Sequence, residues 1–326
     1  MAAARPDAFL PDLARSLNNL APMLSRLGGR EEALAAIQEA VEIGRRLTAE
    51  RPDAFRSDLA ASLNNLANRL SELGRREEAL AASQEAVELL TQLAAERPDT
   101  FRPELARSLH SLGEDLADNE QLQEALESSQ RAVEIRSQLA AARPDAFRPD
   151  LARSLHSLAS RFAALDRPEE AVTAGQEAVD IRRQLAASLP DAFRPDLAAS
   201  LSNLGPLFLM AERPVEALAV SQEAVAINRE LVAVRPEVYS PQLASSLCNL
   251  SQVLAGIQRM AEATRASAEG LEIVAPLLER SPTSFAELTR KLAFAVIGQS
   301  KEAGVEPGMA LLERVARALG HAAPAR

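Results

Sequence analysis

The chain has 326 residues and a formal net charge of −10; 47 % of its residues are hydrophobic, but only 3 % are aromatic and none is tryptophan. This acidic balance excludes a general affinity for nucleic acid, which typically requires a basic surface, and a single cysteine, Cys248, excludes a disulfide framework or a cysteine metal cluster. No stretch approaches the roughly 18 apolar residues that span a bilayer and no secretory signal opens the chain, so we expect a cytoplasmic protein that binds neither membranes nor nucleic acid.

One phrase, RPDAF or a close variant, recurs along the chain at a fixed interval. A constant period of this length is typical of stacked repeats, which grow by adding units and need no second core. The sequence therefore predicts one repeat array in place of two globular domains. The proline of the phrase stands at Pro6, Pro52, Pro98, Pro144, Pro190, Pro236 and Pro282, always 46 residues after the previous one.

The second repeat shows how one unit is built. Leucines at steps of three and four predict an amphipathic helix A over residues 57–73, with Ser57 as its N-cap and Gly74 as its C-cap. A longer helix B is predicted over residues 75–96; glutamates occupy its first turn, and Pro98 stops it. RPDAF is then the connection between units. In other repeats the first helical position of helix A goes to proline: Pro103, Pro149 and Pro195.

Some positions keep their residue type in every repeat, which predicts close packing between helices. Small residues of helix A are Ala21, Ala67, Gly113, Ala159, Gly205 and Ser251, each after a leucine of the column that begins with Leu20. Alanines of helix B include Ala33, Ala79, Ala125, Ala171, Ala217 and Ala263. An aromatic residue recurs in each connection, where we expect it to anchor the core between repeats: Phe9, Phe55, Phe101, Phe147, Phe193, Tyr239 and Phe285.

The second repeat resembles the signature of the tetratricopeptide repeat family at Leu66, Ala67, Leu70, Gly74, Ala79 and Ala86. The segment SLNNLANRLSELGRREEAL looks most like the longer, kinesin-light-chain-like branch of that family. The resemblance implies an all-α, right-handed superhelical solenoid of antiparallel helix pairs whose concave face is lined mainly by helix A. Later repeats depart from the signature where Gly74 is replaced by Glu120, Asp166, Glu212 and Gln258.

The repeats predict the organisation of the whole chain. We expect six tetratricopeptide-like helix pairs over residues 5–280, a degenerate C-terminal capping pair over 281–320, and tails at 1–4 and 321–326. The first repeat has no comparable cap, which suggests end-to-end self-association or a larger parent chain.

The polar side of helix A provides the candidate binding residues. Asn offers both a donor and an acceptor to the backbone of an extended peptide, and Arg can hold a carboxylate through two hydrogen bonds. The resemblance also implies that such Asn columns grip peptide backbone. The candidates are Arg15, Asn18, Asn19, Asn64, Asn65, Asn68, Arg107, His110, Arg153, His156, Asn203 and Asn249.

No catalytic motif occurs in the sequence, so we expect no enzyme, no cofactor and no metal site. A Gly-rich phosphate loop, a His-Glu-x-x-His motif, a nucleophile elbow and a cysteine pair are all missing. His110 and His156 hold the same register in neighbouring repeats, but no third ligand accompanies them at a typical spacing. A groove active site of His110, His156 and Glu114 is the remaining enzyme alternative.

The sequence therefore predicts a non-catalytic scaffold whose concave helix-A face binds a protein or an extended peptide, with acidic groups on the ligand as one option. Two alternatives stay open beside it. One is a self-assembling repeat protein, and the other is the sensor arm of a larger bacterial signalling system.

Overall fold

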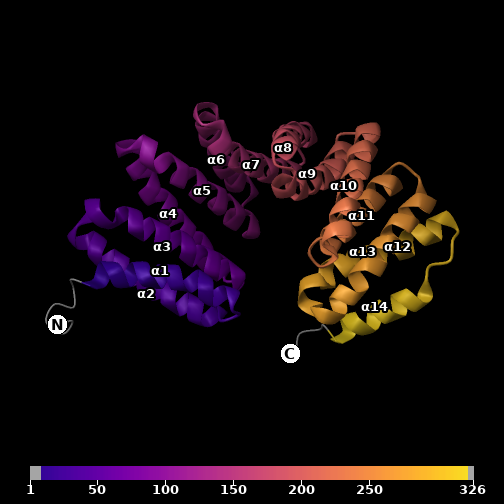
Figure 1. Cartoon of the computed structure of the whole chain (residues 1–326), viewed down its shortest axis with the longest axis horizontal. Helices are drawn as coiled ribbons and strands as arrows, with labels where there is room; N and C mark the ends of the chain where they lie inside the picture. Colours follow the sequence, from indigo (N-terminus) through magenta and orange to yellow (C-terminus); the bar gives the residue numbers. More distant parts are fainter. Residues whose placement is uncertain (1–8, 322–326) are drawn as a thin grey trace. The chain divides into compact units, whose positions relative to one another are not determined.

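Fourteen helices and no strand make up residues 9–321, the part of the chain that this computed structural model describes (Figure 1). The first helices of the repeats, called A helices, are α1 (Leu10–Arg26), α3 (Pro52–Glu72), α5 (Pro98–Asp118), α7 (Pro144–Ala164), α9 (Pro190–Met210), α11 (Pro236–Gly256) and α13 (Pro282–Ala303). The B helices are α2 (Arg30–Glu50), α4 (Arg76–Glu96), α6 (Leu122–Ala142), α8 (Pro168–Ser188), α10 (Pro214–Val234), α12 (Met260–Arg280) and α14 (Met309–His321). Pro6 and the expected tails, apart from His321 at the end of α14, lie outside the described residues.

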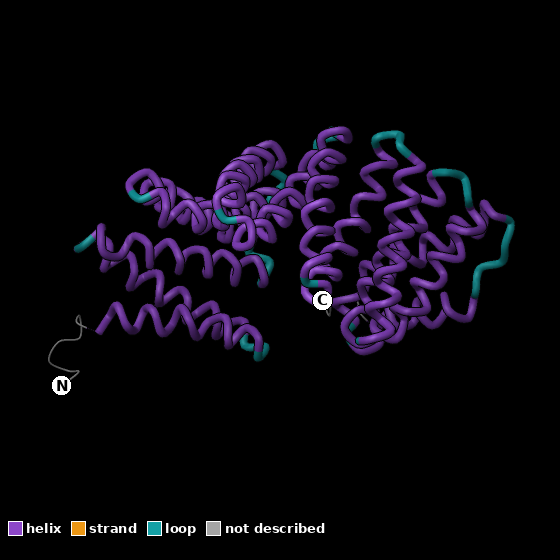
Figure 2. The backbone as a smooth tube through the Cα atoms, turned by 45° about the horizontal axis from the view of Figure 1, so that its top comes forward, coloured by secondary structure: helices purple, strands orange, loops and turns teal. Residues whose placement is uncertain are grey.

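The helices form two compact units, Met1–Leu165 with α1 to α7 and Asp166–Arg326 with α8 to α14. Within each unit, helices that follow one another in sequence pack together through short loops (Figure 2). Consecutive A helices also touch, α1 with α3 and α3 with α5 in the first unit, α9 with α11 and α11 with α13 in the second. The A helices therefore line one side of each unit, which we call the helix-A face. None of the described helices is long and apolar enough to cross a membrane.

The A helices begin earlier than the sequence predicts, because proline opens them. Pro52 takes the first position of α3, where its missing N–H leaves no helical hydrogen bond unmade. The prediction that Ser57 caps this helix is wrong, and so is the interpretation of RPDAF as a connection. Only Arg51 separates α2 from α3. The prolines expected at first positions, Pro103, Pro149 and Pro195, lie inside their helices.

The small residues expected on both helices fill the core, as predicted. The six on helix A are all buried, and the helix-B alanines from Ala33 to Ala263 are 0 % exposed. A Cβ added to Gly205 would lie 2.1 Å from the Oγ of Ser221, so α9 and α10 leave no room for a side chain there. Leu20 is an exception to the expected leucine core, since it is 43 % exposed on α1.

From Phe55 onward the recurring aromatic residue lies in the first turns of helix A and not in a loop, while Phe9 directly precedes α1. Phe101 is buried in the core, and its equivalents from Phe55 to Phe285 are half-buried, whereas Phe9 is 53 % exposed, contrary to the expectation of an anchor. The Cζ of Arg97 lies 4.8 Å from the centre of the Phe101 ring. Arg51 and Arg143 form the same cation–π pair with Phe55 and Phe147, which explains why arginine and the aromatic recur together.

The turns from helix A to helix B keep one geometry although their residues change. Gly74 follows the end of α3 with a φ of +74°, as the C-cap prediction requires, and the N–H of Arg75 donates to the carbonyl of Leu70 at 2.9 Å. The residues that replace Gly74 in later repeats also have positive φ, between 55° and 62°. The backbone therefore follows the same path in these turns, although this conformation strains the non-glycine residues.

Candidate functional site

The predicted site residues all lie on A helices, divided between the two units. The first unit holds Arg15, Asn18 and Asn19 on α1, Asn64, Asn65 and Asn68 on α3, Arg107 and His110 on α5, and Arg153 and His156 on α7. The second unit holds Asn203 on α9 and Asn249 on α11. Each unit therefore presents its own stretch of the helix-A face.

Several of the asparagines bind neighbouring A helices. The Nδ2 of Asn65 donates to the Oδ1 of Asn18 at 2.8 Å, and the Oγ of Ser108 donates to the Oδ1 of Asn64 at 2.7 Å. In the second unit, the Nδ2 of Asn249 donates to the carbonyl of Ser202 at 3.0 Å. These bonds connect successive A helices, so part of the hydrogen-bonding capacity predicted for a ligand is already used.

Other members of the columns keep their polar groups in solvent. Asn19, Asn68 and Arg107 are exposed, and no hydrogen bond or ion pair joins them to another described residue. Arg15 lies 3.6 Å from Asp12, and the Nη2 of Arg153 lies 2.7 Å from the Oδ1 of Asp150, yet both arginines remain exposed. These exposed amides and guanidinium groups are the parts of the face that a ligand reaches first.

Two hollows open between consecutive A helices at the same place in the repeat. The first, about 50 Å³, lies between α1 and α3 and is closed from behind by α2 at Gly44. The second, about 230 Å³, lies between α9 and α11 and is closed by α10 at Asn228. Asn228 stands four 46-residue periods after Gly44, so the two hollows occupy equivalent positions in different repeats.

A buried arginine occupies the equivalent position between α5 and α7. Arg136 of α6 is only 3 % exposed, and its Nη1 donates to the carbonyl of Asp150 at 2.9 Å and to the Oγ of Ser154. Burial lowers the pKa of Arg136 to about 10, and the nearby charges of Arg153 and Arg107 act in the same direction, against that of Asp150. The group remains a cation at neutral pH.

The charges around Arg136 also set the protonation of His110. Burial lowers the pKa of His110 to about 4, and Arg136, Arg153 and Arg161 add to the effect while Glu114 opposes it. Burial alone would raise the pKa of Glu114, but Arg161, 2.7 Å away, and hydrogen bonds from Ser157 and Arg161 lower it overall. This part of the face therefore combines a neutral imidazole with an excess of positive charge.

The arrangement gives little support to the enzyme alternative. Glu114 is held by Arg161 and Ser157, and His110 is neutral above acidic pH. The described residues contain no group of three or more His, Cys, Asp or Glu side chains that could hold a metal ion. Cys248 is buried, and burial raises the pKa of its thiol, which disfavours the nucleophilic thiolate.

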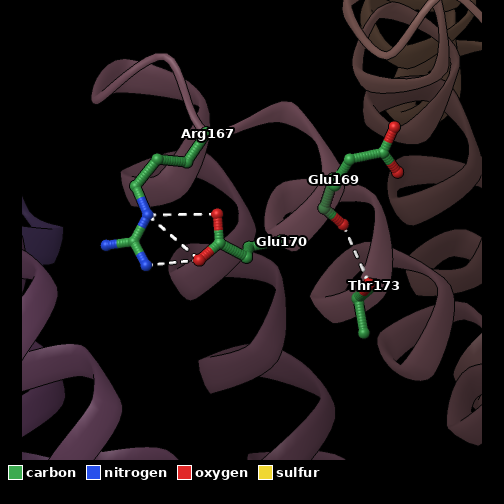
Figure 3. Close-up of polar contacts among 4 residues, drawn as sticks. All are labelled: Arg167, Glu169, Glu170 and Thr173. Atoms are coloured by element: carbon green, nitrogen blue, oxygen red, sulfur yellow. Dashed lines mark hydrogen bonds and ion pairs between the residues drawn. The ribbon is translucent and has the colours of Figure 1, made fainter.

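The charged residues at the starts of the B helices have a structural explanation. At the start of α8, the guanidinium of Arg167 binds the carboxylate of Glu170, with Nε 3.1 Å from both oxygens, while the Oγ1 of Thr173 donates to the carbonyl of Glu169 (Figure 3). The same pair three residues apart recurs at α4, α10 and α12. Such exposed ion pairs contribute little to stability and leave no unpaired group for a ligand.

Helix-B residues behind the helix-A face are absent from the predicted site residues. Gly44, Arg136 and Asn228 share one register, whereas the face was expected to be lined mainly by helix A and every predicted site residue belongs to helix A. A signal for them exists in the sequence. The register varies in chemistry from repeat to repeat, whereas the register four residues before it is alanine from Ala40 to Ala224.

Comparison with known proteins identifies the repeat. Models of the tetratricopeptide repeat match residues 13–50, 59–94 and 104–184. BtubC (BKLC) from P. vanneervenii is 20 % identical, with a TM-score of 0.59 over 76 % of this chain and 92 % of its own. A Podosopora anserina protein assigned to the kinesin light chains, with nearly identical TPR-like repeats, is 26 % identical, with a TM-score of 0.50 over 68 % of this chain and 97 % of its own.

The likeness extends to more distant proteins, where it concerns the fold alone. The apo form of RapI is 12 % identical, with a TM-score of 0.57 over 89 % of this chain and 98 % of its own. No curated protein sequence matches the chain significantly. The similarity thus defines the repeat and its packing.

Proposed function

Because the chain belongs to the tetratricopeptide repeat family, with repeats of the kinesin-light-chain-like kind, we propose that it is a non-catalytic scaffold that binds an extended peptide segment of a protein partner. Repeats of this family generally mediate protein–protein interactions. The peptide lies along the helix-A face. The acidic net charge and the single cysteine fit a cytoplasmic protein without nucleic-acid or membrane partners.

The observation that carries this proposal is the set of solvent-exposed amide and guanidinium groups on consecutive, touching A helices. The backbone of an extended peptide presents N–H and C=O groups that lose water on binding and require partners. Asn19 and Asn68 supply donors and acceptors, and Arg107 and Arg153 supply charge-assisted donors. The hollows between A helices offer room for peptide side chains.

A pull-down from cell lysate tests the choice of face. The helix-A variant carries Asn68→Ala, Arg107→Glu and Arg153→Glu. A control variant makes the same kinds of change on exposed positions of the B helices in the same unit, with Gln84→Ala, Arg76→Glu and Arg131→Glu. Partner proteins retained by the wild type and the control but lost by the helix-A variant support the proposal. Partners retained by all three proteins contradict it.

Self-association is a second candidate, favoured by the end repeats. Met23 on α1 and Leu27, directly after α1, are 62 % and 86 % exposed, and Phe294 and Ile297 on α13 are 75 % and 50 % exposed. In a head-to-tail contact between two copies these apolar surfaces cover each other. Light scattering then shows a mass that rises with concentration and a monomer after Met23→Glu with Leu27→Glu. A wild type that is monomeric at every concentration contradicts this candidate.

A further inference from the structure

Six exposed residues on α1 and directly beside it follow one another at alternating steps of four and three. They are Phe9, Leu13, Ser16, Leu20, Met23 and Leu27. This is the spacing of the d and a positions of a heptad, which places the residues on one stripe where a second helix packs along the first. At 1.5 Å per residue, the stripe is about 27 Å long. We call it the α1 stripe.

The leucines of the α1 stripe are core residues in later repeats. Leu13 is 42 % exposed, whereas its equivalents are between 4 % and 7 % exposed: Leu59, Leu105, Leu151, Leu197 and Leu243. The preceding B helix covers them, as in the second repeat, where a Cβ added to Gly44 of α2 would lie 3.2 Å from the Cδ1 of Leu59. Among the described residues, no helix covers the α1 stripe in this way.

The serine of the α1 stripe also has a fixed role at the later joints. Its equivalent Ser246 is buried on α11, where it accepts a hydrogen bond at 2.7 Å from the Nδ2 of Asn228 on α10. Ser16 is exposed instead, and its Oγ donates to the carbonyl of Asp12 in its own helix at 2.8 Å. One residue separates each B helix from the next A helix, so the two run antiparallel. The α1 stripe therefore fits an antiparallel helix.

The last helices of the chain present no apolar surface of that length. Phe294 and Ile297 on α13 are three residues apart, so they span about 5 Å, one turn of the helix. On α14 the exposed residues include the charged side chains of Glu313 and Arg314. A head-to-tail contact between two copies therefore leaves most of the α1 stripe in water.

A second α1 matches the whole stripe in one antiparallel register. In this register every a residue of one copy meets a d residue of the other, and the two copies are related by a two-fold axis. The layers are Leu20 with Ser16, Leu13 with Met23, and Leu27 with Phe9. Each layer forms twice, once on either side of the axis.

The same register brings opposite charges together at both ends of the pair. Asp12 and Arg26 occupy g positions, and g positions face each other across an antiparallel pair of helices. Asp12 of one copy therefore lies beside Arg26 of the other, and the contact occurs twice. In a parallel pair g faces e, and all e positions of α1 are leucines, so neither charge meets an opposite one. The charges thus favour the antiparallel arrangement.

We propose that two copies of the chain associate through their α1 helices in an antiparallel, two-fold pair. Each α1 then takes the place that a preceding B helix holds at the later joints. The inference rests on the self-association candidate above and gives it a closed geometry in place of a head-to-tail one. Both copies use the same surface in a two-fold contact, so the assembly stops at the dimer.

Sedimentation of the full chain over a range of concentrations at low salt tests the pair. Leu20→Glu places two charges at the centre of the stripe, and the control Leu189→Glu changes an exposed leucine outside it. Asp12→Arg and Arg26→Asp each set like charges together at both ends of the pair. An equal mixture of these two variants restores opposite charges at both ends. Thermal melting checks that every variant folds.

We expect the mass of the wild type and of Leu189→Glu to level off at twice 35.0 kDa. Leu20→Glu raises the dissociation constant of the dimer about a hundredfold or more, because the glutamates lose water in an apolar seam. Each charge variant alone dimerises about tenfold more weakly than the wild type, and their mixture recovers the affinity of the wild type.

The outcomes that overturn the inference are distinguishable. A mass that rises beyond the dimer, or a dimer that survives Leu20→Glu, removes the two-fold pair and leaves self-association in another geometry. A mixture of the charge variants that dimerises as weakly as each variant alone contradicts the antiparallel register. A wild type that is monomeric at every concentration contradicts the pair and the self-association candidate together, and leaves the peptide-binding proposal in place.

Discussion

Non-glycine residues in the turns between helix A and helix B hold a left-handed backbone conformation. Glu212 has a φ of 57° and occupies the place of Gly74. A non-glycine residue in this region costs the folded state about 1 kcal/mol. Replacement by glycine removes that cost, but the greater conformational freedom of glycine in the unfolded chain cancels part of the gain. We therefore predict that Glu212→Gly stabilises the protein by about 0.5 kcal/mol and raises the thermal midpoint.

The control for this prediction is Gln222→Gly, an exposed position inside α10. Glycine in a helix interior destabilises by up to about 1 kcal/mol, so this variant melts at a lower temperature than the wild type. A decrease for both variants would show that the turn at Glu212 is not strained.

The pKa of His110 makes part of the stability dependent on pH. Its folded-state pKa is about 4, below the usual 6.5, so between these values the unfolded chain binds a proton that the folded chain does not. This contribution to stability is complete above pH 6.5 and is lost as the pH falls towards 4. We predict that the wild type loses more thermal stability between pH 7 and pH 5 than His110→Asn, which carries the residue found at Asn64.

Nuclear magnetic resonance provides the direct measurement for His110. The imidazole signal that disappears in His110→Asn identifies the residue, and its titration midpoint lies well below that of a solvent-exposed histidine. A normal midpoint, or equal losses of stability for wild type and variant, would refute the burial and the positive surroundings of this side chain.

At the scale of helices, α9 and α10 approach each other closely because the small residue Gly205 of α9 packs against the small residue Ser221 of α10. Ser221 is 1 % exposed and its hydroxyl has no hydrogen-bond partner among the described residues, while an added Cβ on Gly205 would lie 2.1 Å from that hydroxyl. We predict that Gly205→Ala alone destabilises by about 1–3 kcal/mol through overpacking. Ser221→Ala alone is neutral or stabilising, because it removes an unsatisfied polar atom.

The double variant Gly205→Ala with Ser221→Ala distinguishes packing from other causes. Removal of the hydroxyl makes room for the new methyl group, and alanine favours the helix by about 1 kcal/mol over glycine. The double variant is therefore expected to melt at or above the wild-type temperature. Additive losses in this double-mutant cycle would contradict a direct contact between the two positions.

The helix pairs were predictable because their signals lie within one repeat and recur in every copy. The leucine stripe, the small residues and Gly74 each restrict the local packing, and the structure confirms them. The start of helix A was wrong because proline ends one helix and opens the next with a single residue, Arg51, between them. Proline disfavours a helical conformation for the residue before it and suits the first position of a helix, so the same proline ends one helix and begins the next.

At the scale of the molecule, sequence alone placed the columns of the helix-A face but not the state of their side chains. Whether Asn65 is free or bonded to Asn18 depends on the distance between neighbouring repeats, which no single repeat encodes. The role of Arg136 depends likewise on three helices that meet behind the face. The fold follows from the positions that keep their residue type in every repeat, and the chemistry of the site follows from the positions whose residue type differs between repeats.

Site-specific photo-crosslinking in cells tests most directly the claim that the helix-A face binds a protein partner. A photoreactive amino acid replaces Asn68 or Arg107 on the A helices, and Gln84 or Arg131 on the B helices, all exposed positions of the first unit. We predict discrete crosslinked species from the two helix-A positions and none from the helix-B positions. Crosslinks confined to the helix-B positions, or equal at all four, would contradict the account.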